Sequence, residues 1–161
     1  MQLRRFILLA VFWLAAMGAM VIIAPVGKHA VLSSVMFCLG HVLMVLMVWW
    51  FPVGLTSQTA LAGIFTLGIL ARLIFLPYPV GNDVFRYVWE GYIQNLGFNP
   101  YHFSPLHPAL AEVARGDLHA IWPQINHPDI SAAYPPVTLM IFRGLAWLKP
   151  DPFLFKAVMI G

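Results

Sequence analysis

The sequence predicts an all-α membrane protein: a multi-pass bundle with about four membrane segments and part of a fifth, plus a long outer loop containing an amphipathic helix. The first observation is composition, since 61% of the 161 residues are hydrophobic and only 9% are charged. Soluble domains usually carry about 25% charged residues. The second observation is a series of apolar runs about as long as a bilayer core is thick. Because so apolar a chain cannot cover itself with polar surface, the bilayer is its natural solvent.

The first apolar run covers residues 6–24 and contains no charge. At a rise of 1.5 Å per residue, such a helix spans roughly 28 Å, close to the thickness of a bilayer core. Arg4 and Arg5 precede it, as they would in a signal peptide. The apolar part of a cleaved signal peptide is shorter, about 7–15 residues. We therefore expect a retained membrane anchor, followed by a short turn at 25–29.

The second and third runs cover residues 30–51 and 60–76. The second ends in aromatic residues suited to a membrane–water interface. The third has Arg72 as its single charge, and Pro77 and Pro79 end it. Arg72 either extends its side chain to the membrane surface or meets an anionic lipid headgroup.

The remaining sequence divides into a polar loop and a further apolar part. Residues 78–136 hold five of the six acidic residues, and loops of this length usually carry function. The run 137–148 reaches only about 18 Å and reads as a short or tilted membrane helix. Another apolar run begins at Phe153 and is still open at the last residue, so we expect a fragment of a longer protein. The predicted organisation is 1–77, 78–136 and 137–161.

Charge gives the expected orientation and excludes one class of partner. Arg4 and Arg5 place the N-terminus in the cytoplasm by the positive-inside rule. Three crossings then place the 78–136 loop in the periplasm of a cell with an inner membrane. The net charge of +3 and pI of about 9.3 come from scattered basic residues without a basic stripe, so we expect no nucleic-acid partner. The sequence does not indicate an oligomeric state.

The loop begins with a segment, 81–97, that has helical periodicity. At about 100° per residue, Asp83, Glu90 and Gln94 fall within roughly 40° of one another, and apolar side chains fill the other face. This pattern predicts an amphipathic helix lying on the bilayer or on the membrane helices. Arg86 can pair with Asp83 or Glu90. These charges form either a functional cluster or an ordinary first-turn acid and helix salt bridge.

Residues at both ends of this helix mark its expected boundaries. Asn82 is expected to be its N-cap, and Gly97 is expected to end it. Three segments rich in proline and aromatic residues follow, at 98–101, 122–128 and 133–136. Aromatic rings stack on sugar faces and amides bind hydroxyls, so these segments fit a sugar site. They fit interfacial aromatics and loop punctuation equally well.

Five short segments of the loop form a combined pattern: 83–91 (DVFRYVWEG), 97–101 (GFNPY), 121–123 (IWP), 125–128 (INHP) and 134–136 (YPP). Together these segments resemble the first outer loop of GT-C-type glycosyltransferases, in particular bacterial polyprenol-phosphate-dependent mannosyltransferases. The resemblance spans about residues 72–143 and departs in one respect: the many later membrane helices of that family are missing.

The resemblance implies a GT-C-like membrane fold and an enzyme that takes a sugar, with mannose as the first candidate, from a polyprenyl-phosphate donor held in the membrane lipid. Asp83 would be the general base. Arg86 would stabilise the leaving phosphate or hold the two carboxylates in place. Glu90 would be a second carboxylate, a metal ligand or a structural partner. The expected substrate-binding residues are Tyr87, Trp89, Asn99, Tyr101, Asn126, His127 and Tyr134.

Cofactor and class remain open at this point. Some members of the resembled family use a divalent cation, and the sequence does not decide whether this chain does. The alternative function is a non-enzymatic transporter or lipid flippase subunit, which needs polar residues within its helices. Only His41, Arg72 and Arg143 qualify, so the sequence favours the enzyme. A purely structural membrane subunit would leave the acidic helix without a purpose.

Overall fold

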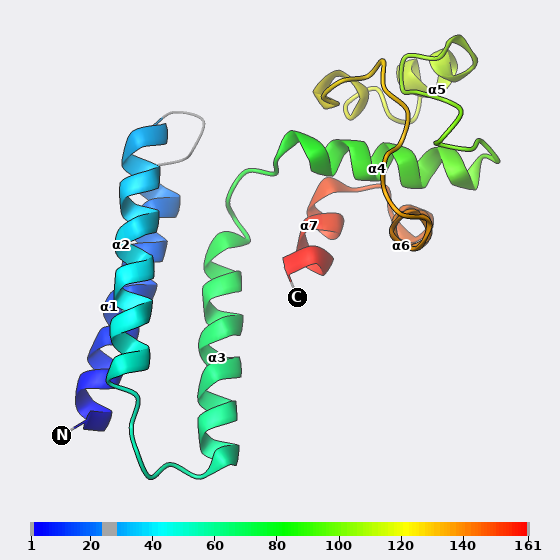
Figure 1. Cartoon of the computed structure of the whole chain (residues 1–161). Coiled ribbons are helices and arrows are strands. Elements are labelled where there is room, and N and C mark those ends of the chain that lie inside the picture. Colours follow the sequence, from blue (N-terminus) through cyan, green and yellow to red (C-terminus); the bar gives the residue numbers. More distant parts are fainter. Residues whose placement is uncertain (1, 24–28, 161) are drawn as a thin grey trace. The chain divides into compact units, whose positions relative to one another are not determined.

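The computed structural model describes residues 2–23 and 29–160, and every regular element in that part of the chain is a helix or a 3-10 turn. The chain forms two compact units, which divide between Tyr78 and Pro79. Three long helices make up the first unit: α1 (Gln2–Ile23), α2 (Ala30–Trp49) and α3 (Ser57–Phe75). Figure 1 shows α1 and α2 side by side.

The three helices of the first unit coincide with the three predicted apolar runs and are candidates for membrane spans. Each is long and apolar enough to cross a bilayer, and no other helix in the described part of the chain meets both conditions. Most of their large apolar side chains are exposed, and α3 buries none of its residues fully. Because exposed apolar surface on this scale is unfavourable in water, these faces suit lipid. The predicted turn at 25–29 lies outside the described residues except for His29.

The second unit is built around α4 (Asn82–Asn95). In the described part of the chain it also contains three shorter helices and two 3-10 turns between residues 108 and 160. Figure 1 shows α6 end-on beside α4. Its other elements are η1 (Pro108–Leu110), α5 (Ala111–Arg115), η2 (Trp122–Gln124), α6 (Pro136–Leu148) and α7 (Pro152–Ile160).

A close approach of two helices defines the centre of this unit. A Cβ atom on Gly91 of α4 would lie 2.2 Å from the backbone oxygen of Phe142 on α6. Only glycine therefore permits this crossing. Gln94 of α4 stabilises the crossing, because its side-chain amide donates a hydrogen bond of 3.0 Å to the backbone carbonyl of Leu139 on α6. Trp89, Phe142 and Phe155 are fully or almost fully buried at the centre of the resulting core.

Two details of α4 differ from the sequence predictions, whereas its C-terminal end and the short helix α6 agree with them. The N-cap is Gly81, not Asn82, and no side chain caps the helix, whereas Gly97 (φ +87°) ends it as predicted. The charged face of α4 does not face solvent as a whole, because Arg86 and Glu90 are buried. The 137–148 run forms a short helix, as predicted: α6 has 13 residues and packs on α4.

Candidate functional site

Asp83 lies in the first turn of α4 with its side chain exposed. One carboxylate oxygen, Oδ1, accepts a hydrogen bond of 2.7 Å from the side-chain amide of Asn126. The helix dipole favours a negative charge at this position. The structure therefore brings together two residues that the sequence places 43 positions apart, and holds one oxygen of Asp83 in a fixed direction.

Arg86 and Glu90 form an ion pair inside the second unit. The Nε of Arg86 donates 2.8 Å to Oε1 of Glu90, and the two residues are only 7% and 1% exposed. The spacing of four residues along a helix permits this contact. Of the two partners predicted for Arg86, the structure selects Glu90.

The other N–H groups of Arg86 donate to four backbone carbonyls of one loop. Nη1 donates to Asn126 (3.3 Å) and His127 (3.0 Å). Nη2 donates to Ile130 (2.5 Å) and Ser131 (3.0 Å). An arginine has five N–H donors, so all of them are used within the protein. Arg86 therefore holds the loop and Glu90 in place, and has no donor left for a phosphate.

The loop held by Arg86, residues 126–131, contains a tight turn. His127 has a positive φ of 47°, which is uncommon for a residue other than glycine. Its carbonyl accepts from both Arg86 and the backbone N–H of Ile130. Because Asn126 begins this loop, the guanidinium that fixes the loop also fixes the amide that binds Asp83.

Glu90 is the buried carboxyl of the site. Its second oxygen, Oε2, has no hydrogen-bond partner in the structure. Burial raises the pKa of Glu90 above its ordinary value, although the hydrogen bond and the charge of Arg86 act in the opposite direction. Because it is sealed from solvent, Glu90 serves the internal network and cannot receive a proton from a substrate directly.

Two tyrosines lie near these carboxylates. The ring of Tyr87 stacks on Phe142 at 4.6 Å and meets Tyr134 edge-on at 5.2 Å. The pKa of Tyr134 is raised to about 12, chiefly by burial. Its neighbour Tyr87 and the negative charges of Glu90 and Asp83 act in the same direction. Tyr134 keeps its hydroxyl proton at neutral pH, and its hydroxyl is hydrogen-bonded to the side chain of Tyr87.

The Asn-Pro-Tyr turn, residues 99–101, is hydrogen-bonded to the backbone of Tyr134. The side chain of Asn99 accepts 3.0 Å from the backbone N–H of Tyr101, which fixes the turn. The hydroxyl of Tyr101 donates 2.5 Å to the carbonyl of Tyr134. Both side chains are exposed, so the turn positions Tyr134 and also leaves polar atoms at the surface.

Trp89 is the predicted substrate-binding residue that the structure sets apart from the others. It is 0% exposed in the core of the second unit. Such a position serves packing and leaves no ring face for a sugar. In contrast, Asn126, Tyr87 and Tyr134 are partly buried, and His127 is exposed. Tyr87 lies on α4 one turn after Asp83 and contacts Tyr134. Asn126 and His127 belong to the loop that bonds Asp83 and Arg86.

Several positioning residues were not predicted. Gly91 was not singled out, although its absent side chain sets the distance between α4 and α6. The pairing of Asn95 with Arg143 was also missed. The Asn95 side-chain amide donates 3.1 Å to the backbone carbonyl of Arg143, and Nε of Arg143 donates 3.3 Å to Oδ1 of Asn95. Glycine within a helical pattern is the one sequence signal that indicates a close approach.

The donor set gives no support to a resident cation. In the described part of the chain, no three His, Cys, Asp or Glu side chains gather as metal ligands. Hard divalent cations take six or more oxygen ligands, often several carboxylates. Asp83 and Asn126 alone do not fit that requirement, so we assign no step to a metal.

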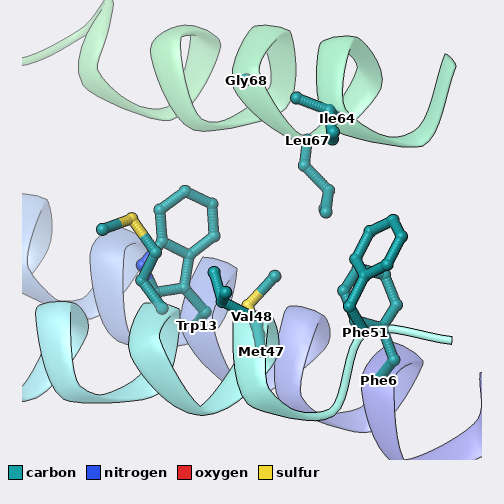
Figure 2. Close-up of a pocket in the computed structure, with 9 residues that line it drawn as sticks. Phe6, Trp13, Met47, Val48, Phe51, Ile64, Leu67 and Gly68 are labelled. Carbon is teal, nitrogen blue, oxygen red and sulfur yellow. The ribbon is translucent and has the colours of Figure 1, made fainter. Parts of the chain in front are cut away.

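A separate apolar cavity lies within the first unit, between α1, α2 and α3 (Figure 2). Its volume is about 540 Å³. Figure 2 shows Trp13, Met47 and Leu67 among its lining side chains. None of the predicted catalytic or substrate-binding residues lines it, so it is not part of the site on α4.

No family model matches the chain, and neither curated proteins nor solved structures show a significant match to it. The loop motif and the geometry around α4 are therefore the two observations that bear on its function.

Proposed function

We propose that this chain is part of a GT-C-type inverting glycosyltransferase that moves a sugar from a polyprenyl-phosphate donor to an acceptor hydroxyl. Mannose is the first candidate for the sugar, by resemblance alone. Asp83 is the general base in this proposal. The second unit faces the outer side of the membrane, with the N-terminus in the cytoplasm.

The observation that carries the proposal is the contrast between the two carboxylates of α4. Asp83 is exposed and oriented by Asn126, whereas Glu90 is 1% exposed and bound to Arg86. The helix thus offers one accessible carboxylate held by a structured loop. Transfer from a phosphate leaving group needs one base, because the departing phosphate needs no proton. A glycosidase needs two accessible carboxyl groups on either side of its bond.

The proposed step is a direct displacement. The acceptor hydroxyl loses its proton to Asp83 as its oxygen attacks C1 of the sugar. The bond between C1 and the phosphate oxygen breaks, and the polyprenyl phosphate leaves with the electron pair. A single displacement inverts the configuration at C1. No oxidant, reductant or further reactant enters the balance.

The neighbouring side chains fit the binding of a sugar. Tyr134 and Tyr87 form a hydrogen-bonded, protonated pair close enough to feel the charges of Asp83 and Glu90, and such a pair can meet sugar hydroxyls. Tyr87, Asn126 and His127 lie on the same segments. Asn99 and Tyr101 add polar atoms at the surface of the adjoining turn. In this proposal Arg86 and Glu90 position the loop and do not touch the substrate.

The test is turnover of a lipid-linked sugar by the protein expressed from its complete reading frame. Vesicles containing the protein receive polyprenyl-phosphate mannose labelled in the sugar and an acceptor pool of membrane glycolipids. Release of free polyprenyl phosphate with label in a new product is the expected result. Movement of intact donor across the bilayer without release would identify a flippase and contradict the proposal.

A further inference from the structure

One helix of the second unit is apolar on both faces. α6 packs on α4 through Leu139, Phe142, Leu145 and Ala146, all buried. Its opposite side carries five exposed apolar side chains: Val137 (69% exposed), Met140 (69%), Ile141 (52%), Trp147 (76%) and Leu148 (67%). At about 100° per residue, these five occupy an arc of roughly 120°. We call this arc the outer face of α6.

The outer face differs from the scattered apolar residues of an ordinary protein surface. Its members repeat at the spacings of one helix face, so they form a continuous stripe. Trp147 lies near the helix end, and tryptophan is enriched at the depth of lipid headgroups. Arg143, which is exposed, borders the stripe. Lys149 follows the helix directly; its side chain is 68% exposed, and its ammonium also pairs with Asp151 at 2.8 Å. Apolar residues beside basic ones are the composition of helices that lie on anionic membranes.

The length of α6 excludes an upright membrane span. Its 13 residues reach only about 20 Å, compared with roughly 30 Å for a bilayer core. α3, a candidate span, ends at Phe75, and α4 begins at Asn82. The six residues between them reach at most about 20 Å when fully extended. The unit that carries α6 is therefore tethered to a membrane helix by a short segment.

We propose that α6 lies in the plane of the membrane interface, with its outer face in the upper acyl region and its basic residues among anionic headgroups. Membrane lipid is the occupant of this face. α4, the helix predicted from sequence to lie on the bilayer or on the membrane helices, does not have such a face, because η2, α6 and α7 pack around it. The proposal does not depend on glycosyl transfer.

Spin labels at two positions of the outer face test the proposal. Cys38 is the only cysteine of the sequence, so Cys38→Ser gives a background without thiols. Met140→Cys, Trp147→Cys and the control Ala120→Cys, on an exposed loop residue, are then labelled one at a time. Because all three side chains are exposed, their replacement removes no core contact. Collision rates with oxygen and a water-soluble nickel chelate are measured in vesicles of phosphatidylethanolamine and phosphatidylglycerol.

The depth of the two labels separates the outcomes. Met140 and Trp147 lie about 10 Å apart along the helix axis. A helix in the interface places both labels at one shallow depth, with oxygen collisions favoured over nickel, while the Ala120 label favours nickel. Depths that differ by about 10 Å would indicate a tilted or spanning helix and overturn the proposal. Labels that match the Ala120 label, or that are shielded from both reagents by protein, would also overturn it.

Discussion

At the scale of single residues, Arg86 carries most of the structure around the site. Its guanidinium bonds Glu90 and four carbonyls of the 126–131 loop, including that of Asn126. Burial of an ion pair is costly, and removal of one partner leaves the other uncompensated. The orientation of Asp83 depends on this network, because the Asn126 amide that binds it begins the loop.

Arg86→Met is expected to destabilise the second unit by about 3–5 kcal/mol, since it leaves Glu90 and the loop carbonyls without partners. Thermal unfolding in detergent, followed by tryptophan fluorescence, measures the loss. The control is Arg115→Met, which changes an exposed arginine of α5 and should leave the melting temperature unchanged. Equal effects of the two substitutions would show that the buried network does not stabilise the unit.

Glu90 gives the unit a pH dependence with a defined sign. Its folded pKa is raised above the ordinary value of 4.5, so the folded protein binds the proton more tightly than the unfolded chain. The contribution of this raised pKa to the free energy of unfolding is fully present below about pH 4.5. It is lost as the pH rises through the pKa of Glu90 in the folded protein. Glu90→Gln cannot ionise. The melting temperature of the wild type minus that of the variant should therefore fall as pH is raised above 4.5. A difference that stayed constant or increased would contradict the raised pKa.

At the scale of elements, the crossing of α4 and α6 depends on Gly91. Addition of one Cβ atom there places it 2.2 Å from the Phe142 oxygen, which forces the helices apart. Gly91→Ala should cost about 1–3 kcal/mol or more in stability. Gly144 of α6 is the matched control, because a Cβ atom there meets nothing within 4 Å. Gly144→Ala should be neutral or stabilise by up to about 1 kcal/mol.

The two glycine variants are compared by thermal unfolding under one condition. If Gly91→Ala melts at the wild-type temperature, the close crossing of α4 and α6 is not present in the folded protein.

The elements differ in how far the sequence could predict them. Run length and composition were enough for α1, α2 and α3, because a bilayer imposes a length that can be read directly. Helical periodicity and Gly97 gave the extent of α4 to within two residues at either end. Its environment was not predictable, because the residues that bury Arg86 lie about 40 positions away in the loop. The run 137–148 was predicted as a short or tilted membrane helix, and its helical state is confirmed. Sequence alone does not fix its surroundings, since an apolar run of that length also fits a core helix or an interfacial one.

The candidate site was predictable in its residue types and not in their roles. Asp83 and Asn126 were singled out separately, and their contact depends on a turn at His127 with positive φ that no local pattern indicates. Trp89 was expected to bind substrate because it lies within the segment 83–91 that carries the family resemblance. It is instead a core residue, with no exposed surface in the second unit.

At the scale of the whole molecule, the proposed orientation sets which parts of the chain are outside the cell membrane. If the N-terminus is cytoplasmic, the turn at Gly54 is also cytoplasmic and the loop at Ala120 is periplasmic. A periplasm-specific phosphatase fused after Ala120 should be active, and one fused after Gly54 inactive. The reversed pattern would place the second unit in the cytoplasm and contradict the outward-facing site.

The central claim is that Asp83 is the base of a sugar transfer, and substitution of that carboxylate tests it most directly. Asp83→Asn keeps the size of the side chain and removes its basicity, so transfer from polyprenyl-phosphate mannose should fall about 10²–10⁴-fold. Glu112→Gln, at an exposed carboxylate of α5, is the matched control and should transfer at the wild-type rate. Transfer by Asp83→Asn at the wild-type rate, with the protein folded, would contradict the role of Asp83.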